Sequence, residues 1–140
     1  MLIPHKALIV VADGTRARFF RNMGRETKIQ LSAEGELKPA HLLNEGPARK
    51  RPKESSHQEM DEATFAKQLA QELFRRVQSR DFEVLILIAD PQTLGEIRPS
   101  LHKEVQSRLI SEIAKTLTKA SIADIQKALT FEKSIAQIRF

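Results

Sequence analysis

The amino-terminal part of the chain alternates short apolar runs with turn residues. Residues 7–12 (ALIVVA) form a continuous apolar run of strand length, and residues 16–22 (RARFFRN) alternate arginine with apolar positions. Asp13-Gly14-Thr15 between them predicts a hairpin, because glycine adopts positive φ without a steric penalty. We predict a third strand over 27–32, ended by Glu34-Gly35-Glu36, so that the chain begins with a β meander.

The clearest periodic signal covers residues 61–79. Apolar side chains recur four positions apart, at Phe65, Leu69, Leu73 and Val77. This spacing places them on one face of an amphipathic helix. Ser56 or Asp61 would cap its amino terminus, because both residue types accept a hydrogen bond from free backbone N–H groups.

The second half of the chain adds two strands and two helical segments. The unbroken apolar run 84–89, ended by Asp90-Pro91, predicts a central strand covered on both faces. A helical segment within 92–106 is interrupted at Pro99. Residues 108–115 fit a short last strand or a helical turn, of which we favour the strand.

Ser121 then caps a helix that runs through Leu129. The predicted order is therefore β β β α β α β α, an α/β fold with a mixed sheet. A chain of 140 residues is typical of one domain, so we expect a single domain over residues 1–140.

Residues 44–58 differ in composition from the rest of the chain. They contain glycine, two prolines and no large apolar side chain, which predicts a mobile loop. Its basic residues are Arg49, Lys50, Arg51 and Lys53. Such a run binds phosphates or is simply a solvated loop. Arg16 and Arg18 share one face of their strand. They would either extend a nucleic-acid-binding patch or form the solvent-exposed face of the meander.

Charge and cysteine content narrow the classes of function. The net charge of +5 is compatible with an anionic partner such as RNA, DNA or phosphate. The absence of cysteine removes thiolate nucleophiles, zinc ribbons and disulfides, and is typical of a reducing compartment. The run 7–12 is too short for a signal sequence or a membrane span. We therefore expect a cytoplasmic protein without membrane insertion.

Asp13 and Asp90 raise an alternative, because each follows an apolar run. Ribonuclease H-like domains have the same order of three meander strands, a helix and a further strand. Their carboxylates hold two Mg²⁺ ions for phosphodiester cleavage. Glu62 or Glu72 would supply the carboxylate from the helix. In the simpler interpretation Asp13 is a hairpin corner and Asp90 a helix cap. We find no other catalytic or metal-binding motif and expect no cofactor.

Four stretches in order resemble the bacterial host attachment protein family: ALIVVADGTRARFF, FAKQLAQELFRRV, VLILIADPQTLGEIRPSL and IAKTLTKASIADIQKAL. The resemblance covers nearly the whole chain. Its most specific positions are Asp13, Gly14, Arg18, Asp90, Leu94, Gly95, Arg98 and Thr118. It implies a role in attachment to host cells, which for a cytoplasmic protein would be an indirect phenotype. A homo-oligomeric protein acting in adhesion is a further alternative.

That family is similar to the middle domain of archaeo-eukaryotic release factors and Pelota, which implies the same mixed sheet. In release factors the loop before the first long helix carries Gly-Gly-Gln. Here Gln58 follows Ser56-His57 without a glycine pair. The resemblance therefore implies a non-enzymatic domain with no catalytic residue, which binds RNA or the ribosome through the basic loop.

Overall fold

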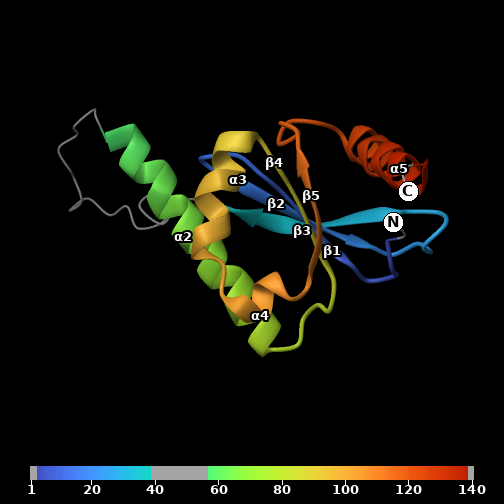
Figure 1. The fold of residues 1–140 in the computed structure, drawn as a ribbon, viewed down its shortest axis with the longest axis horizontal. Coiled ribbons are helices and arrows are strands. Elements are labelled where there is room, and N and C mark those ends of the chain that lie inside the picture. Colours follow the sequence, from blue (N-terminus) through green and yellow to red (C-terminus); the bar gives the residue numbers. More distant parts are fainter. Residues whose placement is uncertain (1–2, 39–56, 139–140) are drawn as a thin grey trace.

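The computed structural model describes residues 3–38 and 57–138, with side chains described within 3–38 and 65–130 (Figure 1). Its elements are, in chain order, β1 (Leu8–Ala12), β2 (Ala17–Asn22), β3 (Leu31–Leu37), α2 (His57–Gln78), β4 (Leu85–Ala89), α3 (Pro91–Ile97), the 3₁₀ helix η2 (Arg98–Ser100), α4 (Lys103–Gln106), β5 (Leu109–Ala114) and α5 (Ile122–Ile138). This sequence of elements confirms the predicted α/β order.

The five strands form one mixed sheet in the order β3-β2-β1-β4-β5. β1 pairs antiparallel with β2, which pairs antiparallel with β3, as a meander requires. β1 also pairs in parallel with β4, and β4 in parallel with β5. The two central strands β1 and β4 are therefore in register, with Ala12 opposite Ala89 at their carboxyl ends.

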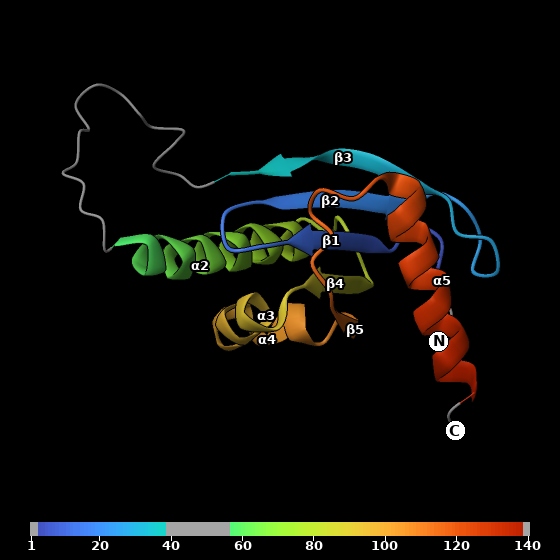
Figure 2. The same ribbon diagram turned by 90° about the horizontal axis from the view of Figure 1, so that it is seen from above.

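Both faces of the central strands are covered, as their unbroken apolar sequences predict. In β1, Leu8 and Val10 belong to the apolar layer beneath α2, α3 and α4, whereas Ile9 and Val11 belong to the layer beneath α5. Figures 1 and 2 show α2 and α3 on one side of the sheet and α5 on the other. No helix within the described ranges is long and apolar enough to cross a membrane.

The prediction for the third strand was wrong in position. β3 begins at Leu31 and runs through Gly35, whereas residues 23–30 form a loop. Gly35 has a φ of 122°, a conformation that favours glycine, and the β2–β3 register shifts between Phe19 and Phe20. Phe19 pairs with Gly35 and Phe20 with Ala33, so Glu34 is the extra residue of a β-bulge.

The β1–β2 hairpin is present at the predicted place, but Gly14 does not supply a positive φ. In the described part of the chain Gly35 is the glycine with that conformation. The Asp13 backbone N–H donates to the Arg16 carbonyl at 2.9 Å, and the carboxylate of Asp13 holds the turn. Side-chain acceptance by aspartate thus replaces the glycine-based turn that we predicted.

Helix boundaries differ from the predictions mainly at their outer ends. α2 begins at His57, inside the segment predicted as a loop, and α5 continues to Ile138 rather than ending at Leu129. The segment 92–106 divides into α3, η2 and α4 around Pro99, as expected. Residues 109–114 form the favoured strand β5.

Candidate functional site

Asp13 organises the turn that follows β1. One carboxylate oxygen, Oδ1, accepts hydrogen bonds from the Thr15 backbone N–H (2.7 Å), the Thr15 hydroxyl (2.9 Å) and the Arg16 backbone N–H (3.0 Å). This is an Asx turn, in which a short acidic side chain satisfies backbone donors that the hairpin leaves free. Asp13 is therefore the corner of the hairpin, as the simpler interpretation predicted.

The second oxygen of Asp13 reaches a distant part of the chain. Its Oδ2 accepts a hydrogen bond of 2.8 Å from the hydroxyl of Thr118, which is buried. The guanidinium of Arg18 donates to the carbonyls of Thr118 (3.0 Å) and Ala120 (2.8 Å) and lies over the ring of Phe20. The predicted family positions Asp13, Arg18 and Thr118 therefore meet in one cluster.

This cluster fixes residues 115–121, which link β5 to α5. β4 lies between β1 and β5 in the sheet, so the contact from the end of β1 to a residue after β5 spans the carboxyl end of β4. That edge is where open α/β sheets commonly bind ligands. Here the chain's own linker lies across it.

The environment of Asp13 favours its charged form. Partial burial acts to raise the pKa of this carboxyl, but the hydrogen bonds from the Thr15 backbone, the two threonine hydroxyls and the Arg16 backbone outweigh it, so the pKa lies below the ordinary value of 3.8. A carboxylate held ionised by four donors is unsuited to general acid or base catalysis, which needs a pKa near the working pH, and its hydrogen bonds give it an anchoring role.

Asp90 follows the register partner of Ala12 and caps α3. Its Oδ2 accepts from the Thr93 backbone N–H at 3.1 Å, and its Oδ1 accepts from the Thr93 hydroxyl at 2.7 Å. Asp13 and Asp90 thus stand at the ends of neighbouring strands, as the nuclease hypothesis requires. Both carboxylates are engaged by turn and cap donors instead.

The helix carboxylate of the nuclease hypothesis lies elsewhere. Glu72 of α2 binds Arg75 at 2.7 Å and Arg76 at 2.8 Å. The side chain of Glu62 lies outside the described residues. Within the described ranges no group of three or more His, Cys, Asp or Glu side chains is placed to hold a metal ion. The geometry therefore supports fold-stabilising roles for Asp13 and Asp90.

The predicted family positions Leu94, Gly95 and Arg98 form a second group on α3 and η2. Leu94 is buried in the layer beneath α2, and Arg98 forms a charged hydrogen bond of 2.7 Å with Glu112 of β5. A Cβ on Gly95 would meet nothing within 4 Å, so packing does not explain this glycine. Arg98 and Leu94 together fasten the α3–η2 segment to β5 and α2.

The proposed nucleic-acid contacts fall into two parts. Arg49, Lys50, Arg51 and Lys53 lie outside the described residues, in the segment between β3 and α2. Arg16 and Arg18 bind internal groups: Arg16 pairs with Glu36 at 3.5 Å and donates to the Thr118 carbonyl at 3.4 Å. Their contribution to nucleic-acid binding stays a prediction.

Sequence reasoning missed a network of charges at the opposite end of β2. Arg21 is buried and pairs with Glu34 and Asp81, both at 2.9 Å, and Asp81 also binds Arg76 at 3.3 Å. Burial acts to raise the pKa of Asp81, but hydrogen bonding and attraction from Arg21 and Arg76 lower it below 3.8. No sequence signal marked this network, because the bulge that places Glu34 was itself not predicted.

A second unpredicted feature is the clasp around Asn22. Its amide donates to the carbonyls of Ile3 (3.0 Å) and Pro4 (3.1 Å), and its oxygen accepts from the backbone N–H groups of Gly24 (2.9 Å) and Gln30 (3.0 Å). The loop 23–30 is thereby closed at its base. A Cβ on Gly24 would lie 2.3 Å from the Lys28 carbonyl, so this position requires glycine.

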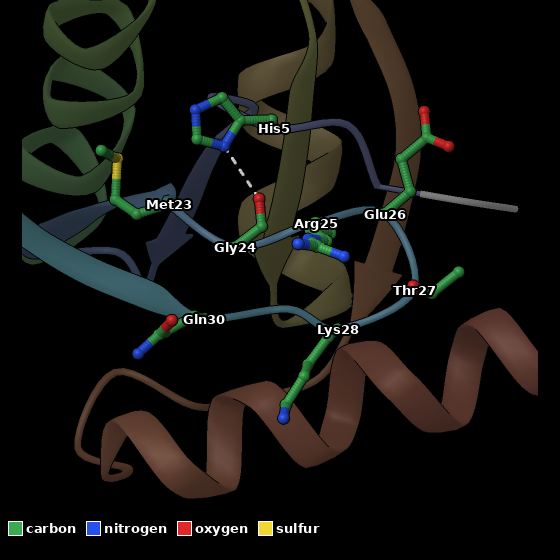
Figure 3. Close-up of a pocket in the computed structure, with 8 residues that line it drawn as sticks. All are labelled: His5, Met23, Gly24, Arg25, Glu26, Thr27, Lys28 and Gln30. Carbon is green, nitrogen blue, oxygen red and sulfur yellow. Dashed lines mark hydrogen bonds between the residues drawn. The ribbon is translucent and has the colours of Figure 1, made fainter.

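An open pocket lies against this loop (Figure 3). Its described lining residues are His5, Met23, Gly24, Arg25, Glu26, Thr27, Lys28 and Gln30. His5 donates from Nδ1 to the Gly24 carbonyl at 2.8 Å, because a carbonyl can only accept. The Lys28 side chain points toward α5. The side chains face different directions, so no reacting constellation forms.

The fold and its edge cluster define an α/β domain in which Asp13, Arg18 and Thr118, three positions singled out by the sequence resemblance, make anchoring contacts. The sequence model of the bacterial archaeo-eukaryotic release factor family 12 matches residues 6–129. The chain therefore belongs to this family. No curated protein matches the chain.

Two solved structures are similar to the chain. An archaeal protein is 12% identical with a TM-score of 0.49, and the match covers 94% of this chain and 40% of that one. The archaeal translation termination factor aRF1 is 10% identical with a TM-score of 0.46, covering 94% of this chain and 41% of that one. The chain thus spans about two fifths of the length of both structures.

Proposed function

We propose that this protein is a translation-related, non-enzymatic domain that binds RNA or the ribosome through Arg49, Lys50, Arg51 and Lys53. The single observation that carries the proposal is the presence of four basic side chains within five positions, in the segment that joins β3 to α2. Each phosphate that such a side chain neutralises adds affinity that falls with salt concentration. Membership of a release factor family supports a partner in translation.

Arg16 and Arg18 have a positioning role in this proposal. Arg18 donates to two backbone carbonyls, so it fixes the start of α5 rather than pointing freely at a ligand. The host attachment implied by the sequence resemblance would be an indirect consequence of a translational role. Oligomerisation in adhesion also stays a prediction, and the described exposed large hydrophobics are Met23 and Ile110.

Sucrose-gradient sedimentation of cell extract tests the proposal. At low salt we expect the protein to sediment with ribosomal particles, and to leave them as the salt concentration rises. A variant carrying Arg49→Glu, Lys50→Glu, Arg51→Glu and Lys53→Glu should remain at the top of the gradient.

The matched control reverses four exposed basic residues elsewhere, Arg25, Lys28, Lys119 and Lys127, which changes the net charge equally. This control should sediment like the natural protein. A protein that stays at the top at every salt concentration, or two variants that behave alike, would overturn the proposal.

A further inference from the structure

A second surface feature lies between α2 and the η2–α4 turn. It is an open groove of about 440 Å³, within the size range of small-ligand sites. α2 contributes Lys67, Gln71 and Phe74 to its walls, and the opposite wall includes Ser100 and His102. Lys67, Gln71 and Phe74 are four and three positions apart, so they line one face of the helix.

A stacked ring pair stands in this groove. The centroids of the Phe74 and His102 rings are 4.0 Å apart, with an angle of 21° between their planes. Phe74 is half-buried, whereas His102 is exposed. Because Phe74 covers one face of the imidazole, the exposed surface of His102 lies on its other face and edge. A flat ring surface is therefore presented to solvent.

The orientation of His102 is fixed by the backbone. Its Nδ1 accepts a hydrogen bond of 3.0 Å from the Glu104 N–H, at the start of α4. An accepting Nδ1 carries no proton, so in the neutral ring the proton is on Nε2. This bond holds the ring at its edge, and Phe74 holds it at one face. The His102 side chain therefore loses less conformational entropy when a ligand stacks on it.

The polar groups of the groove match one class of ligand. Lys67 is exposed and carries a positive charge, while Gln71 is exposed and carries an amide that can both donate and accept. No acidic side chain is among the described lining residues. A flat ring, an ammonium and an amide together suit a nucleobase with its phosphate, because unpaired bases stack on aromatic or histidine rings and are recognised along their edges.

We propose that this groove holds one unpaired nucleobase of RNA, stacked on the exposed face of His102, with a neighbouring phosphate against Lys67. The proposal rests on the proposed function for its ligand class. Lys67 lies ten residues after His57, where the described part of α2 begins. Ten helical residues extend about 15 Å, which a few nucleotides of single-stranded RNA can span. One RNA strand can therefore reach both the start of α2 and the groove.

Titrations with two ligands distinguish binding of the base from binding of the phosphate. We would follow the His102 ring signals by NMR while titrating AMP, and separately inorganic phosphate. AMP should shift the His102 signals, and inorganic phosphate at the same concentration should leave them in place. If AMP leaves them unmoved, the groove does not hold a base.

Variants then test the groove with a single-stranded ten-nucleotide oligoadenylate. His102→Asn supplies a side-chain oxygen that can cap α4 in place of Nδ1 but removes the ring, so we expect about tenfold weaker binding. His102→Tyr should restore a stacking surface and most of the affinity. Lys67→Gln should weaken binding and reduce its salt dependence by about one phosphate. Lys127→Gln, on exposed α5 surface, is the matched control and should bind normally.

The failures of the two proposals are distinguishable. If His102→Asn and Lys67→Gln bind oligoadenylate as tightly as the natural protein, the groove is not the site, whatever the gradients show. If ribosomal sedimentation fails but AMP still shifts the His102 signals and His102→Asn weakens oligoadenylate binding, the groove proposal stands without the proposed function.

Discussion

The hydroxyl of Thr118 donates a 2.8 Å hydrogen bond to the carboxylate of Asp13, although the two residues are 105 positions apart. This bond connects the first hairpin to the linker before α5. Arg18 adds two hydrogen bonds to the same linker, at the carbonyls of Thr118 and Ala120. The placement of α5 over the sheet therefore depends on a residue of the first turn.

Replacing Thr118 by valine removes one buried hydroxyl while keeping nearly the same volume. The Asp13 oxygen then loses its partner, so we expect the free energy of unfolding to fall by about 1–2 kcal/mol. Urea unfolding at pH 7 measures this loss. Thr116→Val, at an exposed position of the same linker, should change stability by less than about 0.5 kcal/mol. Equal losses in both variants would contradict a specific role for the Asp13–Thr118 bond.

Asp13→Asn tests the charge of the same anchor through pH. Because the folded pKa of Asp13 lies below its ordinary value of 3.8, ionisation stabilises the fold above that value, and the contribution is lost as the pH falls through the folded pKa. The natural protein should therefore be more stable than Asp13→Asn at pH 7, and the difference should shrink below pH 3.8. Urea midpoints at several pH values measure it. A difference independent of pH would show that the charge is not involved.

Arg21→Met should be among the most destabilising single changes on this face. It leaves Glu34 and Asp81 without their shared partner, and we expect a loss of about 2–3 kcal/mol, since both carboxylates keep some contact with solvent. Arg75→Met removes an exposed partner of Glu72, and we expect it to cost much less stability than Arg21→Met, because solvent screens an exposed ion pair. Thermal and urea unfolding of the two variants give the comparison, and a similar cost for both would refute the central position of Arg21.

Asn22→Ala should open the loop 23–30 locally. The backbone N–H groups of Gly24 and Gln30 lose their acceptor, so their hydrogen exchange should accelerate at least about tenfold. The Arg25 N–H, which donates to the Lys28 carbonyl inside the loop, is the internal reference and should change less. Uniform acceleration at all three amides would indicate global destabilisation instead of a lost clasp.

Local sequence patterns predicted most of the architecture. The strand at 84–89 was predictable because burial on both faces requires an unbroken apolar sequence. The helix around Leu69 was predictable because burial of one face requires apolar residues at helical spacing. The third strand failed for the opposite reason. Its sequence from Leu31 to Leu37 is mostly exposed and has only the small residues Ala33 and Gly35 at the alternate positions between the two leucines, so its apolar alternation is weak. Its position depends on a bulge and on the Asn22 clasp.

The candidate site was predictable only in part. Asp90 as a helix cap and Asp13 as a turn residue follow from short-range chemistry, and the structure confirms both roles. The joining of Asp13 to Thr118 is a tertiary contact, which spacing along the chain does not encode. Likewise, nothing in the sequence around Phe74 or His102 indicates that their rings stack, because the contact forms only when α4 packs against α2.

The parallel pairing of β1 with β4 also constrains the order in which the newly made polypeptide can assemble. Leu8 is opposite Leu85, so the edge of β1 that pairs with β4 has no partner until β4 has been synthesised. That takes about 4–15 s more at usual elongation rates. During that interval the amphipathic α2 can cover only one face of the meander, and the edge of β1 that later pairs with β4 stays exposed. A nascent chain stalled before residue 85 should therefore be cut by protease within residues 8–12, where the finished protein resists cleavage.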